Sequence, residues 1–304
     1  MDLRVVFMGS PEFALPTLQA LAEHYPVVGV VTQPDKPAGR GRTLTPPPIK
    51  VLAGQLGLPV IQPRRLRQPE AMEQLEAWNP NLIVVAAFGQ ILKPEVLDLP
   101  QWGCINVHAS LLPRWRGAAP IQAAILAGDA ETGVSIMQMD AGIDTGPVFS
   151  RRAVPIDPHD TAGTLGARLA TLGAGLLLET LPACLSGAIT PSPQEDGEPT
   201  YAPMLKKEDG LLNFHEAASA LARRVRAFQP WPGTFFFWQD QPLKVLRARA
   251  VAEEIATPGR RVLYQGLPAV GAADGLLVLD EVQPAGKKVM PGKVFLQGAR
   301  GWLD

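Results

Sequence analysis

An asparagine and a histidine two positions apart are the residues of this 304-residue chain whose types and spacing most clearly suggest chemistry. Asn106 and His108 lie in the apolar run 103–108, which predicts a buried strand. Because side chains alternate along a strand, both polar groups would share one face while Val107 points the other way. An amide and an imidazole at a strand end can stabilise negative charge on a carbonyl oxygen. Two ordinary hydrogen-bonded residues at a strand end would look the same, so both interpretations stay open.

Asp144 is the carboxylate that we expect to act with His108. It lies in the glycine-flanked segment 139–146, between expected strands at 134–138 and 148–153. Loops held by such strands often carry catalytic groups. A carboxylate near an imidazole favours the charged imidazolium and helps to pass a proton. The alternative is an aspartate that closes the turn through its own backbone.

Other chemical motifs are missing from the sequence. Cys104 and Cys184 are its only cysteines and lie in apolar stretches, which argues against a disulfide framework and a thiolate metal site and favours a reducing compartment. Phosphate-loop, zinc-helix and nucleophile-elbow patterns do not occur. The turn at 9–14 has only the first glycine of a dinucleotide fingerprint, so a nicotinamide cofactor is not indicated.

The elements that must position these residues alternate between strand and helix. Apolar runs at 3–8, 27–31 and 82–86 predict strands. A serine followed by proline before 12–23 predicts the start of one helix, and 118–127 predicts another. This alternation predicts an α/β fold with a Rossmann-like, doubly wound, mostly parallel sheet, whose ligands bind at the carboxyl ends of the strands.

The last third of the chain has a different pattern. A polar segment rich in proline and glycine predicts a linker. Beyond it we expect one helix at 215–228 and then short strands that predict a small OB-like β-barrel. These strands are expected at 234–238, 243–250, 261–264 and 276–282. The predicted organisation is a catalytic domain at 1–187, a linker at 188–206 and a C-terminal β-barrel domain at 207–304.

Charge is distributed unevenly along a chain whose net charge is −1. Residues 1–205 carry 14 Lys and Arg against 19 Asp and Glu, whereas residues 206–304 carry 14 against 10. A basic C-terminal third indicates a polyanionic partner, with an ordinary solvated surface as the alternative. The long polar loop at 32–48 carries three cations and could close over a phosphate-rich partner, although a disordered surface loop would look alike.

Composition and hydropathy indicate a soluble two-domain protein. Hydrophobic residues make up 46% of the chain and charged residues 19%. The first strand is too short for a signal peptide or a membrane span, and no later uninterrupted apolar run reaches about 18 residues. We therefore expect a cytoplasmic protein that does not engage a membrane.

The chain strongly resembles the folate-dependent formyltransferases over nearly its whole length. The segments that carry the resemblance are MGSPEFA at 8–14, the loop at 33–50, INVHASLLPRWRGAAPIQ at 105–122, ETGVSIMQMDAGIDTG at 131–146, RAFQPWPG at 226–233 and QPAGKK at 283–288. Ser10 stands where the family often has threonine. This difference does not touch the expected chemistry.

The resemblance implies transfer of the formyl group of 10-formyltetrahydrofolate to the α-amino group of methionine on initiator tRNA. Asn106, His108 and Asp144 fall on the family's catalytic positions, and no metal is implied. The implied folate site comprises Ser110, Leu111, Leu112 and Pro113. For tRNA we expect contacts from Lys36, Arg40, Arg42, Lys206, Lys207, Arg223, Arg224 and Arg226.

Two other functions stay open at this stage. A sugar-nucleotide N-formyltransferase shares the catalytic half, but the long basic loop argues against so compact an acceptor. A noncatalytic tRNA-binding module is the alternative from another class of protein. We expect a monomer.

Overall fold

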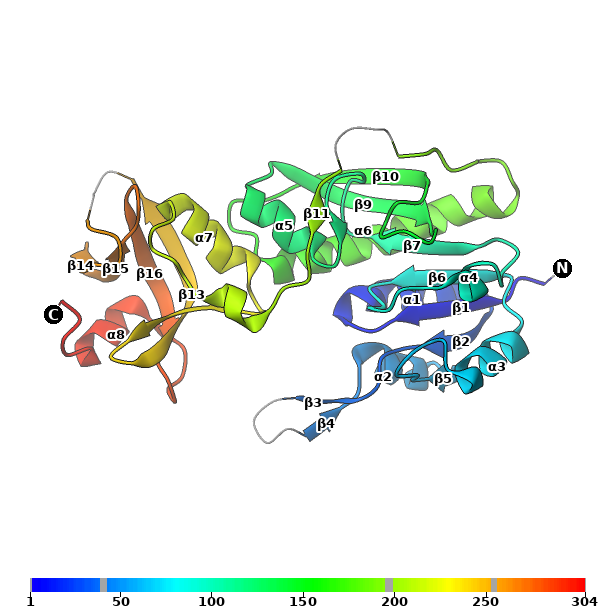
Figure 1. Ribbon diagram of the computed structural model, residues 1–304, viewed down its shortest axis with the longest axis horizontal. Coiled ribbons are helices and arrows are strands. Elements are labelled where there is room, and N and C mark those ends of the chain that lie inside the picture. The colour runs from blue at the N-terminus through cyan, green and yellow to red at the C-terminus, as the bar shows by residue number, and fades with distance from the viewer. Residues whose placement is uncertain (1, 39–42, 195–198, 253–255, 304) are drawn as a thin grey trace. The chain divides into compact units, whose positions relative to one another are not determined.

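The computed structural model describes residues 2–38, 43–194, 199–252 and 256–303 (Figure 1). The chain divides into two compact units, each built from separate stretches of sequence. The first comprises Met1–Pro120, Glu131–Pro155 and Gly166–Ala202; the second comprises Ile121–Ala130, Ile156–Leu165 and Pro203–Asp304. The predicted domain boundaries at 187 and 207 stay a prediction.

A seven-stranded sheet forms the centre of the first unit, in the order β10-β9-β7-β6-β1-β2-β5. Its strands are β1 (Val5–Gly9), β2 (Val27–Val31), β5 (Val60–Ile61), β6 (Leu82–Ala86), β7 (Cys104–His108), β9 (Glu131–Gln138) and β10 (Val148–Pro155). The neighbouring strands β7, β6, β1, β2 and β5 run parallel to one another. By contrast, β9 runs antiparallel to β7, and β10 runs antiparallel to β9. The predicted Rossmann-like, mostly parallel sheet is confirmed.

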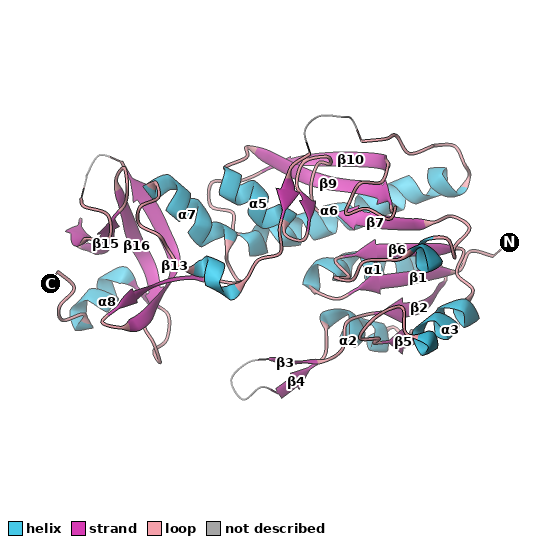
Figure 2. Cartoon of the chain, in the orientation of Figure 1, coloured by secondary structure: helices cyan, strands magenta, loops and turns pink. Residues whose placement is uncertain are grey.

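The helices of this unit are shown in cyan in Figure 2, and proline starts most of them. The helices α1 (Leu15–His24), α2 (Pro48–Gln55), α3 (Pro69–Trp78) and α4 (Pro94–Leu97) each carry a proline in the first turn. A proline there loses no intrahelical hydrogen bond, and its fixed φ suits the helix. Two further helices are α5 (Pro120–Ala127), which lies almost entirely in the second unit, and α6 (Ala162–Leu185), which begins in the second unit and continues in the first.

The two faces of β7 meet different neighbours, as the two-residue alternation predicts. Cys104 packs into a buried cluster with Val85 of β6, Leu75 of α3 and Val96 of α4. Val107, on the opposite face, lies directly against Gly173 of α6. Asn106 and His108 therefore project from the face that α6 does not cover.

The helix α6 is apolar enough, by length and composition alone, to cross a membrane. Charged Arg168 and Glu179 interrupt it, however, and Leu177 and Leu181 are fully buried within the protein. These features are typical of a core helix.

The predicted long loop at 32–48 contains a short hairpin, which sequence analysis did not predict. Its strands are β3 (Lys36–Ala38) and β4 (Thr43–Thr45). Asp35, at its base, accepts hydrogen bonds from Gln62 at 2.7 Å and from Lys50 at 2.8 and 2.9 Å. The amide of Gln62 and then the ammonium of Lys50 lower the pKa of Asp35 from its ordinary value.

An antiparallel sheet, in the order β12-β13-β16-β15-β14, dominates the second unit. The elements are η2 (Lys207–Gly210), α7 (Ala218–Ala227), β12 (Thr234–Trp238), β13 (Gln241–Val251), β14 (Arg261–Tyr264), β15 (Leu267–Gly271), β16 (Leu276–Gln283), β17 (Met290–Pro291) and α8 (Gly292–Gly298). The predicted C-terminal β-rich fold is confirmed, although η2, β15, β17 and α8 were not predicted.

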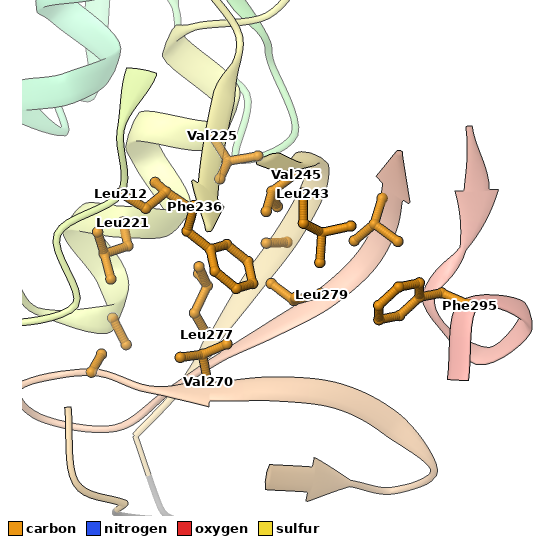
Figure 3. Packing of buried hydrophobic residues seen from close by; sticks show 14 of the residues in the cluster. Leu212, Leu221, Val225, Phe236, Leu243, Val245, Val270, Leu277, Leu279 and Phe295 are labelled. Atoms are coloured by element: carbon orange, nitrogen blue, oxygen red, sulfur yellow. The ribbon is translucent and has the colours of Figure 1, made fainter. Parts of the chain in front are cut away.

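Aromatic side chains fill one end of the second unit's core, beside the aliphatic residues that Figure 3 shows. Phe295 lies edge-on to Trp238 and to Trp302, with ring centroids 5.1 and 5.5 Å apart. Phe236 makes similar edge contacts with Phe214 and Trp302. Such pairs add to the free energy of burial because the ring edges and faces carry opposite partial charges.

Candidate active site

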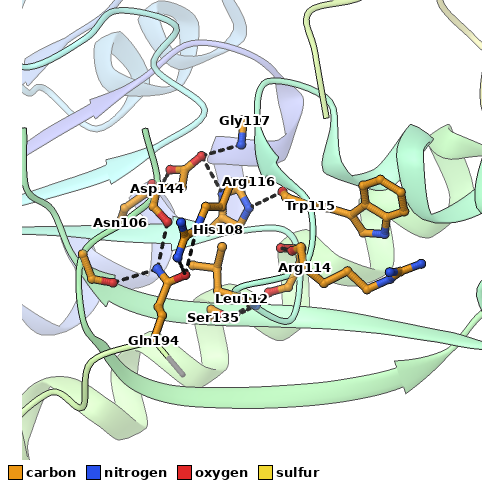
Figure 4. A network of polar contacts seen from close by, with 12 residues as sticks. Asn106, His108, Leu112, Arg114, Trp115, Arg116, Gly117, Ser135, Asp144 and Gln194 are labelled. Atoms are coloured by element: carbon orange, nitrogen blue, oxygen red, sulfur yellow. Dashed lines mark hydrogen bonds and ion pairs between the residues drawn. The ribbon is translucent and has the colours of Figure 1, made fainter. Parts of the chain in front are cut away.

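Asn106 and His108 lie side by side at the carboxyl end of β7, in a buried setting (Figure 4). Only 9% of Asn106 and 5% of His108 is exposed. The Nε2 atom of His108 is 3.0 Å from the carbonyl oxygen of Trp115, and Nδ1 is 3.6 Å from Oδ2 of Asp144. A carbonyl can only accept, so Nε2 carries a hydrogen in this arrangement. Both ring nitrogens therefore face oxygen atoms, Nε2 at hydrogen-bond distance and Nδ1 at ion-pair distance.

The carboxylate of Asp144 completes the group. Its Oδ2 accepts a hydrogen bond from the backbone N–H of Gly117 at 2.8 Å, and its Oδ1 lies 3.4 Å from Nδ2 of Asn106. Asp144 has a φ of 52°, a left-handed conformation that non-glycine residues seldom adopt. The structure thus brings together the three residues that sequence analysis placed in one site. Their chemical roles stay a prediction.

Asp140, rather than Asp144, closes the local turn. Its Oδ1 accepts hydrogen bonds from the N–H of Gly142 at 3.0 Å and from the hydroxyl of Thr145 at 2.7 Å. The alternative interpretation of Asp144, a carboxylate occupied with its own backbone, is therefore not what the structure shows. Asp144 is left to face His108.

The predicted folate segment is a tight turn that uses its own polar groups. Ser110 is fully buried, and its hydroxyl donates to the carbonyl of Arg114 at 2.5 Å. The N–H of Leu112, also buried, donates to the hydroxyl of Ser135 at 3.1 Å. Leu111 and Pro113 are half-buried and retain exposed surface. Folate binding by these four residues stays a prediction.

A second strand pair holds the far side of the site. Here β8 (Arg116–Gly117) runs parallel to β11 (Tyr201–Ala202). The N–H of Trp115 donates to the hydroxyl of Thr200 at 2.8 Å, and the N–H of Arg116 donates to the carbonyl of Thr200 at 2.9 Å. Gly117 has a φ of 112°, and a Cβ there would lie 2.7 Å from the carbonyl of Ala202, so only glycine fits.

Sequence reasoning missed this second wall of the site. Residues 199–202 belong to the segment predicted to be a linker, and its proline- and glycine-rich composition carried no sign of contacts with the site. The segment 105–122, which carries part of the family resemblance, includes Trp115 and Gly117, but the resemblance did not assign their backbone groups a role.

The predicted tRNA-binding cations lie in varied settings. Lys36, Lys206 and Lys207 are exposed, whereas Arg40 and Arg42 lie outside the described residues. Three of the predicted cations lie on α7. There, Nε of Arg223 donates to the carbonyl of Leu126 at 3.0 Å, and Nη1 of Arg226 donates to the carbonyl of Asp160 at 2.8 Å. Arg224 forms an ion pair with Glu216 at 3.0 Å. Burial, and next the charge of Arg223, lower the pKa of Arg226. These three arginines thus tie segments of the second unit together, and RNA contacts from them stay a prediction.

A cavity of about 1300 Å³ lies within the second unit. Its lining includes Arg223 and Arg226 of α7 and also the carboxylates of Asp157 and Glu281. Asn106, His108 and Asp144 do not line it. The cavity is therefore separate from the triad, and its charges are of both signs.

The two thiols are unsuited to nucleophilic chemistry. Burial, and next the charge of Asp98, raise the pKa of Cys104 to about 12. Burial raises the pKa of Cys184 to about 11. Because the thiolate is the reactive form, a raised pKa argues against a nucleophilic role for either thiol. Within the described part of the chain, no three His, Cys, Asp or Glu side chains form a group that could hold a metal ion.

Comparison with known proteins identifies the family. Residues 3–181 match the model of the formyl transferase family, and residues 204–300 match that of the formyl transferase C-terminal domain. Methionyl-tRNA formyltransferase of Citrifermentans bemidjiense is 49% identical, covering 97% of this chain and 93% of the relative. That of Magnetococcus marinus is 51% identical, covering 97% and 95%.

A solved structure shares the fold. HypX from Aquifex aeolicus, determined in complex with tetrahydrofolic acid, superposes with a TM-score of 0.67 at 17% identity. The match covers 99% of this chain and about half, 48%, of that one. Taken with the two family models, which together cover most of the sequence, these findings show that the chain belongs to the formyl transferase family.

Proposed function

We propose that this enzyme transfers the formyl group of 10-formyltetrahydrofolate to the α-amino group of methionyl initiator tRNA, a step in translation initiation. Relatives at 49% and 51% identity over nearly the full chain are named methionyl-tRNA formyltransferase, which supports this acceptor. A sugar-nucleotide acceptor is not favoured, because the full-length relatives carry the tRNA enzyme's name.

The observation that carries the proposal is the convergence of an amide, an imidazole and a carboxylate at the end of β7. In the proposed reaction the neutral amine of methionine attacks the formyl carbon, and a carbon–nitrogen bond forms. The carbonyl oxygen becomes an oxyanion, which Nδ2 of Asn106 and the ring of His108 stabilise. The bond from carbon to the folate nitrogen then breaks, and the electron pair returns to that nitrogen.

Asp144 and His108 move the proton in this scheme. The proton leaves the attacking amine and reaches the departing folate nitrogen, either directly through the imidazole or through one water. The carboxylate of Asp144, 3.6 Å from Nδ1, stabilises the imidazolium that carries it. The substrate must replace the Trp115 carbonyl at Nε2, because that atom is already engaged. No covalent enzyme intermediate is needed, since the formyl group passes straight to the amine.

The folate is proposed to bind beside the triad, against Leu111 and Pro113, with Ser110 and Leu112 shaping the turn beneath it. For tRNA, exposed Lys36, Lys206 and Lys207 offer the charge that phosphate groups require. We further propose that the enzyme works in the cytoplasm, where translation initiation takes place, and that it engages neither a membrane nor a metal. A monomer suffices, because all three catalytic side chains come from one chain.

A formylation assay tests the proposal. Wild-type enzyme should formylate charged initiator tRNA from 10-formyltetrahydrofolate and should leave an aminated nucleotide-sugar unmodified. Asn106→Ala and His108→Ala should each lower kcat by roughly 10²- to 10³-fold while tRNA affinity changes less than about tenfold. His24→Ala, which removes an exposed histidine of α1, is the matched control and should keep full activity. Unchanged turnover in both site variants would refute the mechanism. If the wild-type protein binds tRNA but does not formylate it, the noncatalytic alternative is supported.

A further inference from the structure

The side chain of Gln194 joins two segments of the active site that are distant in sequence (Figure 4). Its Nε2 donates to the carbonyl oxygens of Asp144 and Gly146, each at 2.8 Å. Its Oε1 accepts from Nε and Nη2 of Arg116, at 2.9 and 2.6 Å. Gln194 thus reaches from the segment leading to β11 to both β8 and the loop that carries Asp144.

These contacts fix the orientation of the amide. A carboxamide has two N–H donors and one oxygen with two acceptor positions, and all four are used here. A flipped amide would set its oxygen against two carbonyl oxygens and its NH₂ against a guanidinium. Only one orientation therefore fits, and a carboxylate at this position could not make the same bonds.

The two segments joined by Gln194 are those that set the carboxylate. Asp144 supplies the carboxylate, and Gly117, directly after Arg116, supplies the N–H that Oδ2 accepts at 2.8 Å. The left-handed backbone of Asp144 is unfavourable for a residue with a side chain. External contacts help to hold it, and the bond from Gln194 to its carbonyl is one of them.

We propose that Gln194 is a positioning residue for catalysis: its amide holds the Asp144 backbone and Arg116 at a fixed separation, so that the carboxylate faces His108. The proposal rests on the proposed function for its kinetic consequences. Its geometric consequence, a displaced carboxylate beside His108, does not depend on which amine is formylated.

Gln194→Met tests the proposal by keeping the length of the side chain and removing its four hydrogen bonds. We expect kcat to fall roughly 10- to 100-fold, because a shift of about 1 Å in a catalytic group costs about 10²-fold. The Michaelis constants for both substrates should stay within about threefold. The matched control is Gln239→Met, in the second unit, whose amide likewise donates to a backbone carbonyl, that of Arg300 at 3.0 Å. Its kcat should equal that of the wild type.

A double-variant cycle separates positioning from general support of the fold. If Gln194 acts through the carboxylate, adding Gln194→Met to Asp144→Asn should lower kcat no further. If the two substitutions together lower kcat by the product of their single effects, the proposal is overturned. Should Gln194→Met fail to fold, Gln194→Glu replaces it, since Glu can still pair with Arg116 but sets an oxygen against the carbonyls of Asp144 and Gly146.

The ring signals of His108 provide a readout that needs no tRNA. The chain has 4 histidines, so the proton resonance of each imidazole can be assigned by single substitutions. Gln194→Met should change the chemical shift of the His108 ring, and Gln239→Met should not. An unchanged His108 signal would refute the proposal even if the acceptor differs from methionyl-tRNA. If the wild-type enzyme does not formylate methionyl-tRNA but Gln194→Met changes the His108 signal, only the proposed function is refuted.

Discussion

Replacing Gly173 by alanine tests how closely α6 supports β7, the strand that carries Asn106 and His108. A Cβ at this position would lie 2.7 Å from Cγ1 of Val107 and 3.4 Å from Cγ1 of Val134. Carbon atoms in favourable contact are about 3.5 to 4.0 Å apart, so Val107 must move. Val107 is only 2% exposed and lies between Asn106 and His108 in β7, so its movement displaces this strand.

The expected free-energy change is the difference of two opposing terms. Alanine is favoured over glycine in a helix by about 1 kcal/mol, whereas overpacking a core costs typically about 1 to 3 kcal/mol. Gly173→Ala should therefore lower the free energy of unfolding by roughly 0 to 2 kcal/mol. Gly175→Ala is the matched control, because a Cβ there meets no atom within 4 Å on the same helix. It should stabilise the protein by the full term of about 1 kcal/mol.

Urea unfolding monitored by circular dichroism measures both variants, and a second substitution isolates the contact. Val107→Ala removes Cγ1, the methyl group that the new Cβ strikes, at a cost of roughly 2 kcal/mol from lost burial. The double variant Gly173→Ala, Val107→Ala should be more stable than the sum of the single effects by about 1 to 3 kcal/mol. We also expect kcat of Gly173→Ala to fall several-fold. If Gly173→Ala matches Gly175→Ala in stability and keeps full kcat, the close support of β7 by α6 is refuted.

Three further outcomes are expected. Asp144→Asn keeps an acceptor for the N–H of Gly117 but loses the charge beside His108, so kcat should fall at least about 10²-fold; steady-state kinetics with an unchanged kcat would contradict its role. Because burial raises the pKa of Cys104 and Cys184 to about 12 and about 11, neither should react with iodoacetamide at neutral pH until the protein unfolds, and mass spectrometry showing rapid native labelling would contradict this. The lowered pKa of Asp35 stabilises the folded state at pH values above the carboxyl's ordinary 3.8, and this contribution disappears as pH falls through the folded value. The melting-temperature difference between wild type and Asp35→Asn should therefore shrink below about pH 4, and a difference that grows there would contradict the sign.

The central strands of the first unit could be predicted from local sequence because their apolar runs are continuous. Val27–Val31 and Leu82–Ala86 begin and end where the pattern predicts, since strands of a parallel sheet are buried on both faces. The alternation in β7 likewise predicted that Asn106 and His108 share a face. The expected loop at 32–48 was less successful: its proline- and glycine-rich composition hid the short hairpin of β3 and β4.

What the sequence determined by itself was the identity of the groups and the face on which two of them lie, because a strand's two-residue period is a local property. Only the tertiary structure decided which backbone and side-chain groups surround them. The Trp115 carbonyl at His108, the Gly117 N–H at Asp144 and the Gln194 amide across both segments are contacts between residues 7 to 78 positions apart. Such contacts depend on backbone groups, which every residue type carries, and on how loops close over a finished sheet. No residue type or spacing encodes them, and only the folded chain brings them to the carboxylate and the imidazole.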